Sequence, residues 1–319
     1  MRLLNVAVWG LGNHAQNRII PALTAIDEIK LIGICSRNTK IVEACAEHWS
    51  CYGWNDPDQM LNSTEVDVVY IATPIGVHFS LAKKAIEAGK NVWCEKPLTC
   101  SYIDTQTLVS LSEKKDKILT ESFMHLYHPQ FQRVKKFVDD SKGVHSVICR
   151  FGIPTLDKPG FRNSYELCGG ALWDVATYTV SALLPLFPDQ QVEVIFSEVL
   201  TKKGMQVDNE GRAVLRFSQG ATAYLEWSVG VAYKNEIDIW AIDSSFFTDK
   251  IFSKPKEYQP EYKIRDINGN ESVENGERSE QFIDMFRNFL MVMNDKEQAL
   301  TERENILKRA KLMNDIVNF

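Results

Sequence analysis

A glycine-rich turn near the start of the chain is suited to holding phosphate groups. Gly10-x-Gly12-x-x-Ala15 follows a short apolar stretch and precedes a helical pattern. Gly10 would permit a tight turn, Gly12 would let the backbone approach a diphosphate, and Ala15 is small enough for close helix packing. Asn13 and His14 would begin a helix whose amide groups face the phosphates. The order strand, turn, helix favours a dinucleotide site over a purely structural glycine turn.

The end of the second apolar strand bears on the choice of dinucleotide. Cofactors with a free ribose 2′-hydroxyl usually meet an acidic residue there, but this chain has Ser36-Arg37-Asn38, with Lys40 nearby. A hydroxyl beside a guanidinium suits a 2′-phosphate, because arginine offers paired charged donors. We therefore expect NADP(H) to be preferred, with NAD(H) possible, unless Arg37 is only a solvated turn residue.

Two further strand ends carry polar residues. The third apolar strand ends in Ala72-Thr73-Pro74, and the fourth ends in Glu95-Lys96-Pro97. In an open α/β sheet the ligand crevice lies at the carboxyl ends of the strands. We expect these residues to line it.

The elements needed to position these groups follow from the apolar pattern of the first 121 residues. Short apolar runs alternate with helical patterns, as a parallel sheet with crossover helices requires. The expected strands are Leu3 to Trp9, Leu31 to Cys35, Val66 to Ala72, Asn91 to Cys94 and Ile118 to Glu121. The pattern predicts an α/β protein whose N-terminal domain, residues 1–121, is a Rossmann-type doubly wound parallel sheet.

The pattern changes after residue 121. Strands are expected at Val144 to Ile153, Val192 to Leu200, Ala213 to Phe217, Ala221 to Val229 and Glu236 to Ile242. The fourth of these alternates apolar and polar residues, which is typical of a strand with one buried face. Residues 122–319 are therefore expected to form an α+β domain with a mostly antiparallel open sheet. Lys254 to Asn275 is expected to be irregular, and two helices, about Ser279 to Asn294 and Thr301 to Val317, to close the chain.

The ordered motifs resemble those of the glucose-fructose oxidoreductase / inositol dehydrogenase / rhizopine catabolism (Gfo/Idh/MocA) family. The family's GxGxxx, TP…H and AGK…EKP motifs correspond to Gly10 to Ala15, Thr73-Pro74…His78, and Ala88-Gly89-Lys90…Glu95-Lys96-Pro97. The similarity continues through Gly169 to Tyr178 and spans nearly the whole chain. It implies an NAD(P)-dependent oxidoreductase acting on CH–OH groups, with His78 in the cofactor-binding region and Pro97 commonly cis.

The resemblance also implies roles for Lys96 and Tyr178. The family's EKP lysine binds the reacting oxygen and helps seat the nicotinamide, and a cation there would stabilise charge as hydride arrives at carbon. Asp174 and Tyr178 are four residues apart on an expected helix and would share one face. Many relatives have histidine at the second position, whereas tyrosine resembles the subgroup of deoxysugar 3-ketoreductases and dihydrodiol and xylose dehydrogenases. We expect Tyr178 to be the general acid, although a core tyrosine is the alternative.

Three other positions concern the substrate. Leu126 occupies the place of an arginine in sugar-acting relatives, so that arginine's contact is not expected here. Ala176 replaces the usual glycine near the expected nicotinamide position. Arg162 lies in a segment that resembles a substrate-facing one, and is a candidate, like Asp174, for contact with hydroxyl or phosphate groups. A plain surface arginine is the alternative.

Composition excludes several classes of protein. The chain of 319 residues has 36 basic and 42 acidic residues, a net charge of −6, so nucleic acid and anionic membranes are not expected partners. The apolar stretch Val175 to Pro188 is too short to span a bilayer. The N-terminus lacks the features of a secretory signal, which predicts a cytoplasmic protein. Seven cysteines without a CxxC pair suggest reduced thiols and no metal site.

The leading hypothesis is an NADP(H)-dependent oxidoreductase for a sugar or nucleotide-linked sugar, most simply a ketoreductase. A nucleotide-deoxysugar 3-ketone, a free aldose and a trans-dihydrodiol all remain open as substrates. The alternative is a dinucleotide-sensing regulatory protein of the same fold without turnover. Relatives commonly pair through the open sheet of the second domain, which implies a homodimer or homotetramer.

Overall fold

The computed structural model describes residues 3–319, which form two compact units. The first unit extends to Ser122 and also contains Phe282–Leu307, whereas the second contains Phe123–Gln281 and Lys308–Phe319. Residues 282–307 thus belong to the first unit, although the sequence places them in a domain of residues 122–319.

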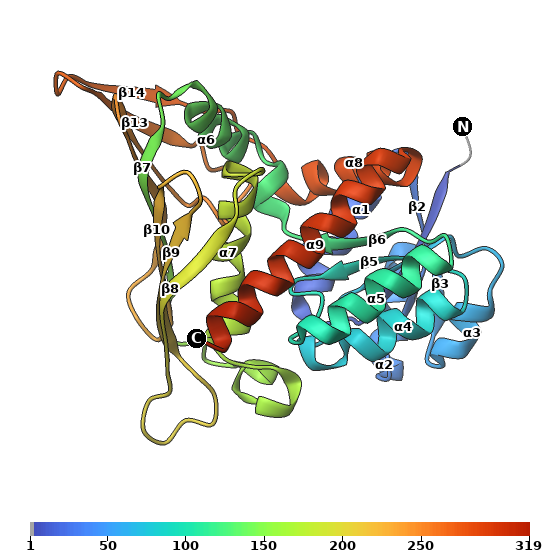
Figure 1. The fold of residues 1–319 in the computed structure, drawn as a ribbon. Helices are drawn as coiled ribbons and strands as arrows, with labels where there is room; N and C mark the ends of the chain where they lie inside the picture. The colour runs from blue at the N-terminus through green and yellow to red at the C-terminus, as the bar shows by residue number, and fades with distance from the viewer. Residues whose placement is uncertain (1–2) are drawn as a thin grey trace. The chain divides into compact units, whose positions relative to one another are not determined.

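The first unit is built on six parallel strands in the order β3-β2-β1-β4-β5-β6 (Figure 1). The strands are β1 (Leu4–Trp9), β2 (Ile29–Cys35), β3 (Tyr52–Trp54), β4 (Val68–Ile71), β5 (Asn91–Glu95) and β6 (Leu119–Ser122). The helices are η1 (Ala15–Ile19), α1 (Ile20–Thr24), α2 (Thr39–Trp49), α3 (Pro57–Asn62), η2 (Ile75–Val77), α4 (His78–Glu87), α5 (Tyr102–Lys114), α8 (Gln281–Asn294) and the first part of α9 (Lys296–Val317). The expected doubly wound parallel sheet is confirmed.

Local signals explain most of these elements. The residues of β4 are all buried, as a central parallel strand requires. Asn38 caps α2 by accepting the Ile41 N–H at 3.2 Å, and Ser101 caps α5 by accepting the Asp104 N–H at 3.2 Å. Neither β3 nor α3 was predicted from the sequence. Strand β3 has only three residues and lacks an alternating apolar pattern.

Aromatic contacts explain why α8 belongs to the first unit. Phe286 packs against Tyr70 and Trp93, with ring centroids 5.5 and 5.8 Å away, and Phe289 lies 5.4 Å from Trp93. All four side chains are fully buried. Helices α4 and α5 contribute Ala82, Ile86 and Leu108, among others, to a separate buried cluster of this unit.

The second unit contains an eight-stranded sheet in the order β14-β13-β12-β11-β7-β10-β9-β8. Its strands are β7 (Val144–Ile153), β8 (Val192–Leu200), β9 (Glu210–Phe217), β10 (Thr222–Val229), β11 (Lys234–Ala241), β12 (Ser244–Asp249), β13 (Glu261–Asp266) and β14 (Glu271–Asn275). Its helical segments are η3 (Met124–Tyr127), α6 (Pro129–Asp140), η4 (Gly160–Asn163), η5 (Tyr165–Leu167), η6 (Leu172–Ala176), α7 (Thr177–Leu183), η7 (Leu184–Leu186) and the end of α9. Among the strands of this sheet within residues 3–319, only β7 and β10 pair in parallel, so the mostly antiparallel sheet is confirmed.

One face of this sheet is covered by helices. In β10, Ala223, Leu225 and Trp227 are buried and join α7 in one hydrophobic cluster. Figure 1 shows α6 and α7 on the same side of the sheet.

Among the described residues, the helical stretch Tyr165–Leu186 is long and apolar enough to cross a membrane, but 72% of its apolar window is buried inside the protein. It is longer than the sequence analysis expected, and its burial is that of a core helix.

The expectation of an irregular segment at residues 254–275 is wrong, because β13 and β14 form a hairpin there. Asp266 builds its turn by accepting the N–H groups of Asn268 and Asn270 at 2.8 and 2.9 Å, and Gly269 adopts a φ of +86°. All residues of β14 are exposed. The strand was missed because it has no buried face to produce an apolar pattern.

The cysteines divide into two groups. Cys35, Cys45, Cys51, Cys94 and Cys149 are free thiols, so the expectation of reduced cysteines is confirmed for these five. Burial raises the pKa of the Cys35 thiol to about 12, which makes it unreactive. Cys100 and Cys168 are disulfide-bonded, so the expectation is wrong for these two.

Candidate active site

The glycine turn after β1 has the shape that the sequence predicts. Gly10 has a φ of +109°, and a β-carbon there would lie 2.6 Å from the Ala72 carbonyl oxygen, so only glycine fits. Above Gly12 the space where a β-carbon would project is open. Ala15 is buried at the start of η1. The turn therefore leaves room for a diphosphate to approach the backbone, and it fits a dinucleotide cofactor.

The carboxyl end of β2 carries exposed positive charge. Ser36 is held by its backbone, which donates to Trp54 and accepts from the Asn55 amide. Arg37 and Lys40 are exposed, and neither makes a hydrogen bond or ion pair with another residue of the described range 3–319. Both side chains are therefore available to an anionic group at this strand end.

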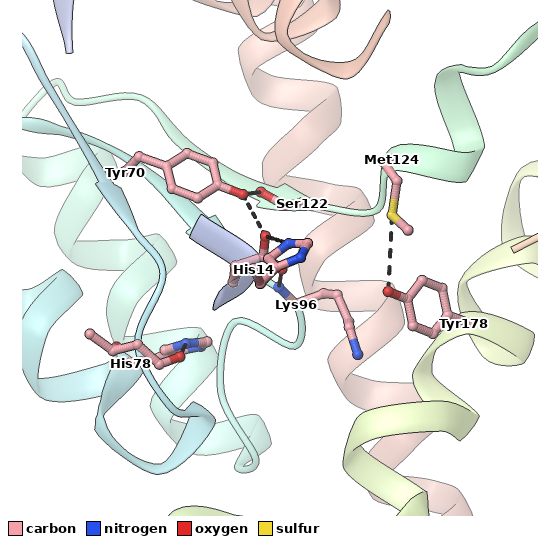
Figure 2. Close-up of polar contacts among 9 residues, drawn as sticks. His14, Tyr70, His78, Lys96, Ser122, Met124 and Tyr178 are labelled. Atoms are coloured by element: carbon pink, nitrogen blue, oxygen red, sulfur yellow. Dashed lines mark hydrogen bonds and ion pairs between the residues drawn. The ribbon is translucent and has the colours of Figure 1, made fainter. Parts of the chain in front are cut away.

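Glu95, at the end of β5, accepts hydrogen bonds from two side chains. The Tyr70 hydroxyl donates to its Oε1 at 2.6 Å, and His14 Nε2 lies 3.0 Å from the same oxygen. The Tyr70 oxygen in turn accepts the Ser122 hydroxyl, whose Oγ lies 3.2 Å away, and Figure 2 shows these contacts around His14. Burial alone raises the pKa of Glu95, but the His14 charge, hydrogen bonds from His14 and Tyr70, and the Lys96 charge together lower it. Glu95 is therefore a carboxylate, held beside Lys96.

His78 joins the two polar strand-end loops of this unit. Its Nδ1 lies 2.9 Å from the Pro97 carbonyl oxygen, and its Nε2 lies 2.8 Å from the Thr73 carbonyl oxygen. The ring is fully buried, and this burial lowers the pKa of His78 although the two carbonyls oppose the shift. The Lys96–Pro97 peptide bond is cis, as the family resemblance implies. Next to this contact, the buried Thr73 Oγ1 has no hydrogen-bond partner among the described residues.

In the second unit Tyr178 lies in an aromatic environment. Its ring contacts those of Phe151, His125 and Phe123 at centroid distances of 5.3, 5.6 and 6.0 Å. The hydroxyl donates to Met124 Sδ at 3.9 Å, as Figure 2 shows. A thioether is a weak acceptor, so this bond is easily exchanged for a stronger one.

Asp174 and Arg162, predicted separately as substrate ligands, pair with each other. Arg162 Nε donates to Asp174 Oδ2 at 2.5 Å. The Asp174 side chain is 10% exposed and that of Arg162 is 38% exposed. Asp174 lies in the π-helix η6, whereas Tyr178 lies in α7, so the spacing between them is not that of a regular α-helix.

The two departures from the family pattern are both core residues. Leu126 is 8% exposed and Ala176 is fully buried, and both belong to the hydrophobic cluster of the second unit. Leu126 therefore contributes packing at this position. Across residues 3–319, no group of three or more histidine, cysteine or acidic side chains is arranged to hold a metal ion.

Sequence reasoning missed Tyr70, Met124 and Asp208. Tyr70 sits inside an apolar strand, where its ring gives no sign that its hydroxyl reaches the strand end. Asp208 belongs to none of the sequence motifs. Its carboxylate accepts the Leu172 N–H at 2.7 Å, at the start of the helical segment that carries Asp174. No sequence signal links residues 208 and 172, because the contact is long-range.

The Rossmann fold and the polar strand-end residues of the first unit, together with Tyr178, Asp174 and Arg162 of the second, define an oxidoreductase with a nucleotide-binding Rossmann unit. Residues 4–123 match the family described as oxidoreductase family, NAD-binding Rossmann fold, and residues 131–245 match the GFO/IDH/MocA C-terminal domain. The chain belongs to the GFO/IDH/MocA oxidoreductase family.

Three relatives illustrate the similarity. The chain is 27% identical to dTDP-3,4-didehydro-2,6-dideoxy-alpha-D-glucose 3-reductase of Actinomadura kijaniata, over 98% of this chain and 94% of that protein. It is 32% identical to D-xylose 1-dehydrogenase (NADP(+)) 2 of Haloferax volcanii, over 69% of this chain and 68% of that protein. A crystal structure of a 3-ketoreductase from Actinomadura kijaniata with NADP and TDP-benzene has a TM-score of 0.94 and 26% identity, covering 99% of this chain and 98% of that one.

Proposed function

We propose that this protein is an NADP(H)-dependent oxidoreductase that transfers a hydride between the nicotinamide and a carbonyl or hydroxyl carbon of a sugar. The 3-keto group of a nucleotide-linked deoxysugar is the favoured acceptor. The observation that carries this proposal is the full-length similarity to a 3-ketoreductase that binds NADP and TDP-benzene. The enzyme class itself follows from family membership.

The first unit is proposed to bind the cofactor. The turn of Gly10, Gly12, Asn13, His14 and Ala15 would hold the diphosphate, since the space above Gly12 is open. Ser36, Arg37 and Lys40 would hold the 2′-phosphate, which favours NADP(H) over NAD(H). Two strand-end loops would bind the nicotinamide half of the cofactor. They are formed by Ala72, Thr73 and Pro74 after β4 and by Glu95, Lys96 and Pro97 at the end of β5. Because His78 is fully buried, it would act by holding these loops.

The second unit is proposed to bind the substrate. NADPH, when bound, supplies the hydride. Lys96 would stabilise the negative charge that grows on the substrate oxygen, and Tyr178 would give its hydroxyl proton to that oxygen. Asp174 and Arg162, as a bonded pair, would bind sugar hydroxyls. The reverse oxidation would use the same groups, so concentrations of the reactants would decide the direction.

NADPH oxidation tests this proposal. The wild type is assayed with a dTDP-linked 3-keto-deoxysugar and, in the reverse direction with NADP, with xylose and a trans-dihydrodiol. The variants Lys96→Met and Tyr178→Phe are expected to lower kcat about 100- to 1,000-fold. Tyr178→Phe should leave the NADPH dissociation constant unchanged. NADPH binding without turnover of any of these compounds would instead favour the dinucleotide-sensing alternative.

The open face of the eight-stranded sheet suggests how the protein assembles. Phe196, Tyr224 and Trp240 on this sheet are 42%, 45% and 61% exposed. Beside them runs a ladder of alternating charges, in register across five strands, formed by Glu198, Arg212, Glu226, Arg150 and Glu236. We propose that a second copy covers this face, giving a homodimer or homotetramer. An exposed apolar surface favours a contact with a second copy. Alternating charges suit a symmetric contact, because the basic residues of one copy can face the acidic residues of the other.

We also propose that the protein is cytoplasmic and that neither nucleic acid nor an anionic membrane is its partner. Five free thiols are consistent with a cytoplasmic location, whereas the disulfide-bonded Cys100 and Cys168 argue against a fully reducing one. The net charge of −6 argues against nucleic acid and anionic membrane partners. Cell fractionation followed by immunodetection would test the cytoplasmic assignment.

A further inference from the structure

The start of the helical segment that carries Asp174 and Tyr178 is held by a residue distant in sequence. Asp208 precedes β9, and its carboxylate Oδ2 accepts the Leu172 N–H at 2.7 Å. Its backbone carbonyl accepts the Ala171 N–H at 3.1 Å. The first N–H groups of a helix have no partner within the helix, so an external acceptor stabilises that end. Asp208 therefore caps this segment from another part of the chain.

Gly170 makes room for this cap. It has a φ of +109°, and a β-carbon at this position would lie 2.1 Å from Asp208 Oδ1. The carboxylate thus occupies the space that any other side chain would need. Gly170 also donates its N–H to the Arg162 carbonyl at 2.9 Å and accepts the Asp174 N–H at 3.2 Å. Gly170, which lies in the stretch Gly169 to Tyr178 that carries the family resemblance, is therefore required by this packing.

The segment that presents Asp208 is itself fixed to the sheet of the same unit. The neighbouring Asn209 is 1% exposed. Its N–H donates to the Leu200 carbonyl at 3.0 Å, and its carbonyl accepts the Val229 N–H at 2.7 Å. Its side-chain Oδ1 accepts the Lys202 N–H at 2.7 Å. Asp208 is therefore a hydrogen-bond acceptor whose position is fixed by the sheet. It holds the start of the helical segment at a fixed place relative to that sheet.

We propose that Asp208 is a positioning residue for the reaction, because it sets where the helix bearing Asp174 and Tyr178 begins. This inference rests on the proposed function, which gives those two residues their roles. The segment runs without a break from η6, which carries Asp174, into α7, which carries Tyr178, so a small slip of its first turn displaces both side chains. A misplacement of about 1 Å at a reacting group can lower the rate about 100-fold.

Amide hydrogen exchange followed by mass spectrometry tests the cap directly. In the variant Asp208→Ala, exchange over residues 169–183 is expected to rise by at least about tenfold, whereas Asp208→Asn, which keeps an acceptor oxygen, should stay closer to the wild type. Asp266→Ala is the matched control, because Asp266 also accepts two backbone N–H groups but in the β13–β14 turn. Unchanged exchange over 169–183 in both Asp208 variants would overturn the cap.

Kinetics test the positioning role. Asp208→Ala is expected to lower kcat about 10- to 100-fold without changing the NADPH dissociation constant, measured by fluorescence, with partial rescue in Asp208→Asn. Faster exchange with an unchanged kcat would overturn the positioning role. If the wild type turns over no substrate, the proposed function fails. The exchange result still decides whether Asp208 caps the helical segment.

Discussion

Arg162 Nε donates to Asp174 Oδ2 at 2.5 Å, so the two residues expected separately to meet the substrate form one bonded unit. The arginine is 38% exposed and the aspartate 10% exposed. The pair therefore presents a guanidinium to solvent while its carboxylate is mostly sheltered. A sugar hydroxyl that bound here would meet a donor and an acceptor already oriented by each other.

A double-mutant cycle should reveal this coupling. We expect Arg162→Met and Asp174→Asn each to lower kcat/KM for the keto sugar by about 10- to 100-fold, because each removes the ion pair between the two side chains. The double variant should lose little more than either single variant. Losses that simply multiply would mean that the two residues act independently.

Cofactor choice should depend on Arg37. Arg37→Ala is expected to weaken NADPH binding about 10- to 100-fold, since a charge-assisted contact to the 2′-phosphate would be lost. NADH lacks that phosphate, so its affinity serves as the internal control and should not change. Fluorescence titration measures both, and an unaltered NADPH affinity would remove Arg37 from the site.

His78 should be needed for the stability of the first unit. His78→Ala leaves the buried carbonyl of Pro97 and the partly buried carbonyl of Thr73 without this partner and opens a cavity, so we expect a loss of about 2 kcal/mol or more in the free energy of unfolding. Denaturant unfolding measures the loss. The exposed His48 provides the control variant His48→Ala, for which a change below about 0.5 kcal/mol is expected. Equal effects of the two substitutions would contradict this assignment.

The stability contributed by Asp208 should depend on pH. Burial raises the pKa of Asp208 to about 6 from its ordinary value of 3.8, against the backbone N–H groups that favour the ionised form. Because the pKa is raised in the folded state, this contribution is fully present below pH 3.8 and is lost as the pH rises through 6. The shift corresponds to at most about 3 kcal/mol.

The comparison variant for this pH dependence is Asp208→Asn, which does not titrate. The free energy of unfolding of the wild type, minus that of the variant, should fall between pH 4 and pH 7. A difference that is constant over this range, measured by urea unfolding, would show that the carboxyl has an ordinary pKa.

Assembly should depend on the open sheet face. Tyr224→Glu places a negative charge among the exposed apolar residues and is expected to convert the oligomer to a monomer, as judged by analytical ultracentrifugation. Tyr52→Glu, at an exposed tyrosine of the first unit, should leave the oligomer intact. A wild type that sediments as a monomer at micromolar concentration would exclude this proposal.

Local sequence determined much of this protein. The strand β1, the glycine turn at Gly10 and the EKP loop after β5 could be predicted, because apolar runs, glycine conformation and strand-end position depend on adjacent residues. The family resemblance rests on the same short motifs. The end of β2 separately predicted a preference for NADP(H), because it has Ser36 and Arg37 where an acidic residue would bind a free 2′-hydroxyl.

Only the tertiary structure decided the pairing of Arg162 with Asp174, the capping of Leu172 by Asp208 and the reach of the Tyr70 hydroxyl to Glu95. Their partners lie 12, 36 and 25 residues apart, and hydrogen bonds over such separations depend on how strands and loops pack. The hairpin of β13 and β14 was missed for a related reason. Its strands are held mainly by backbone pairing, which leaves little trace in the order of apolar and polar side chains.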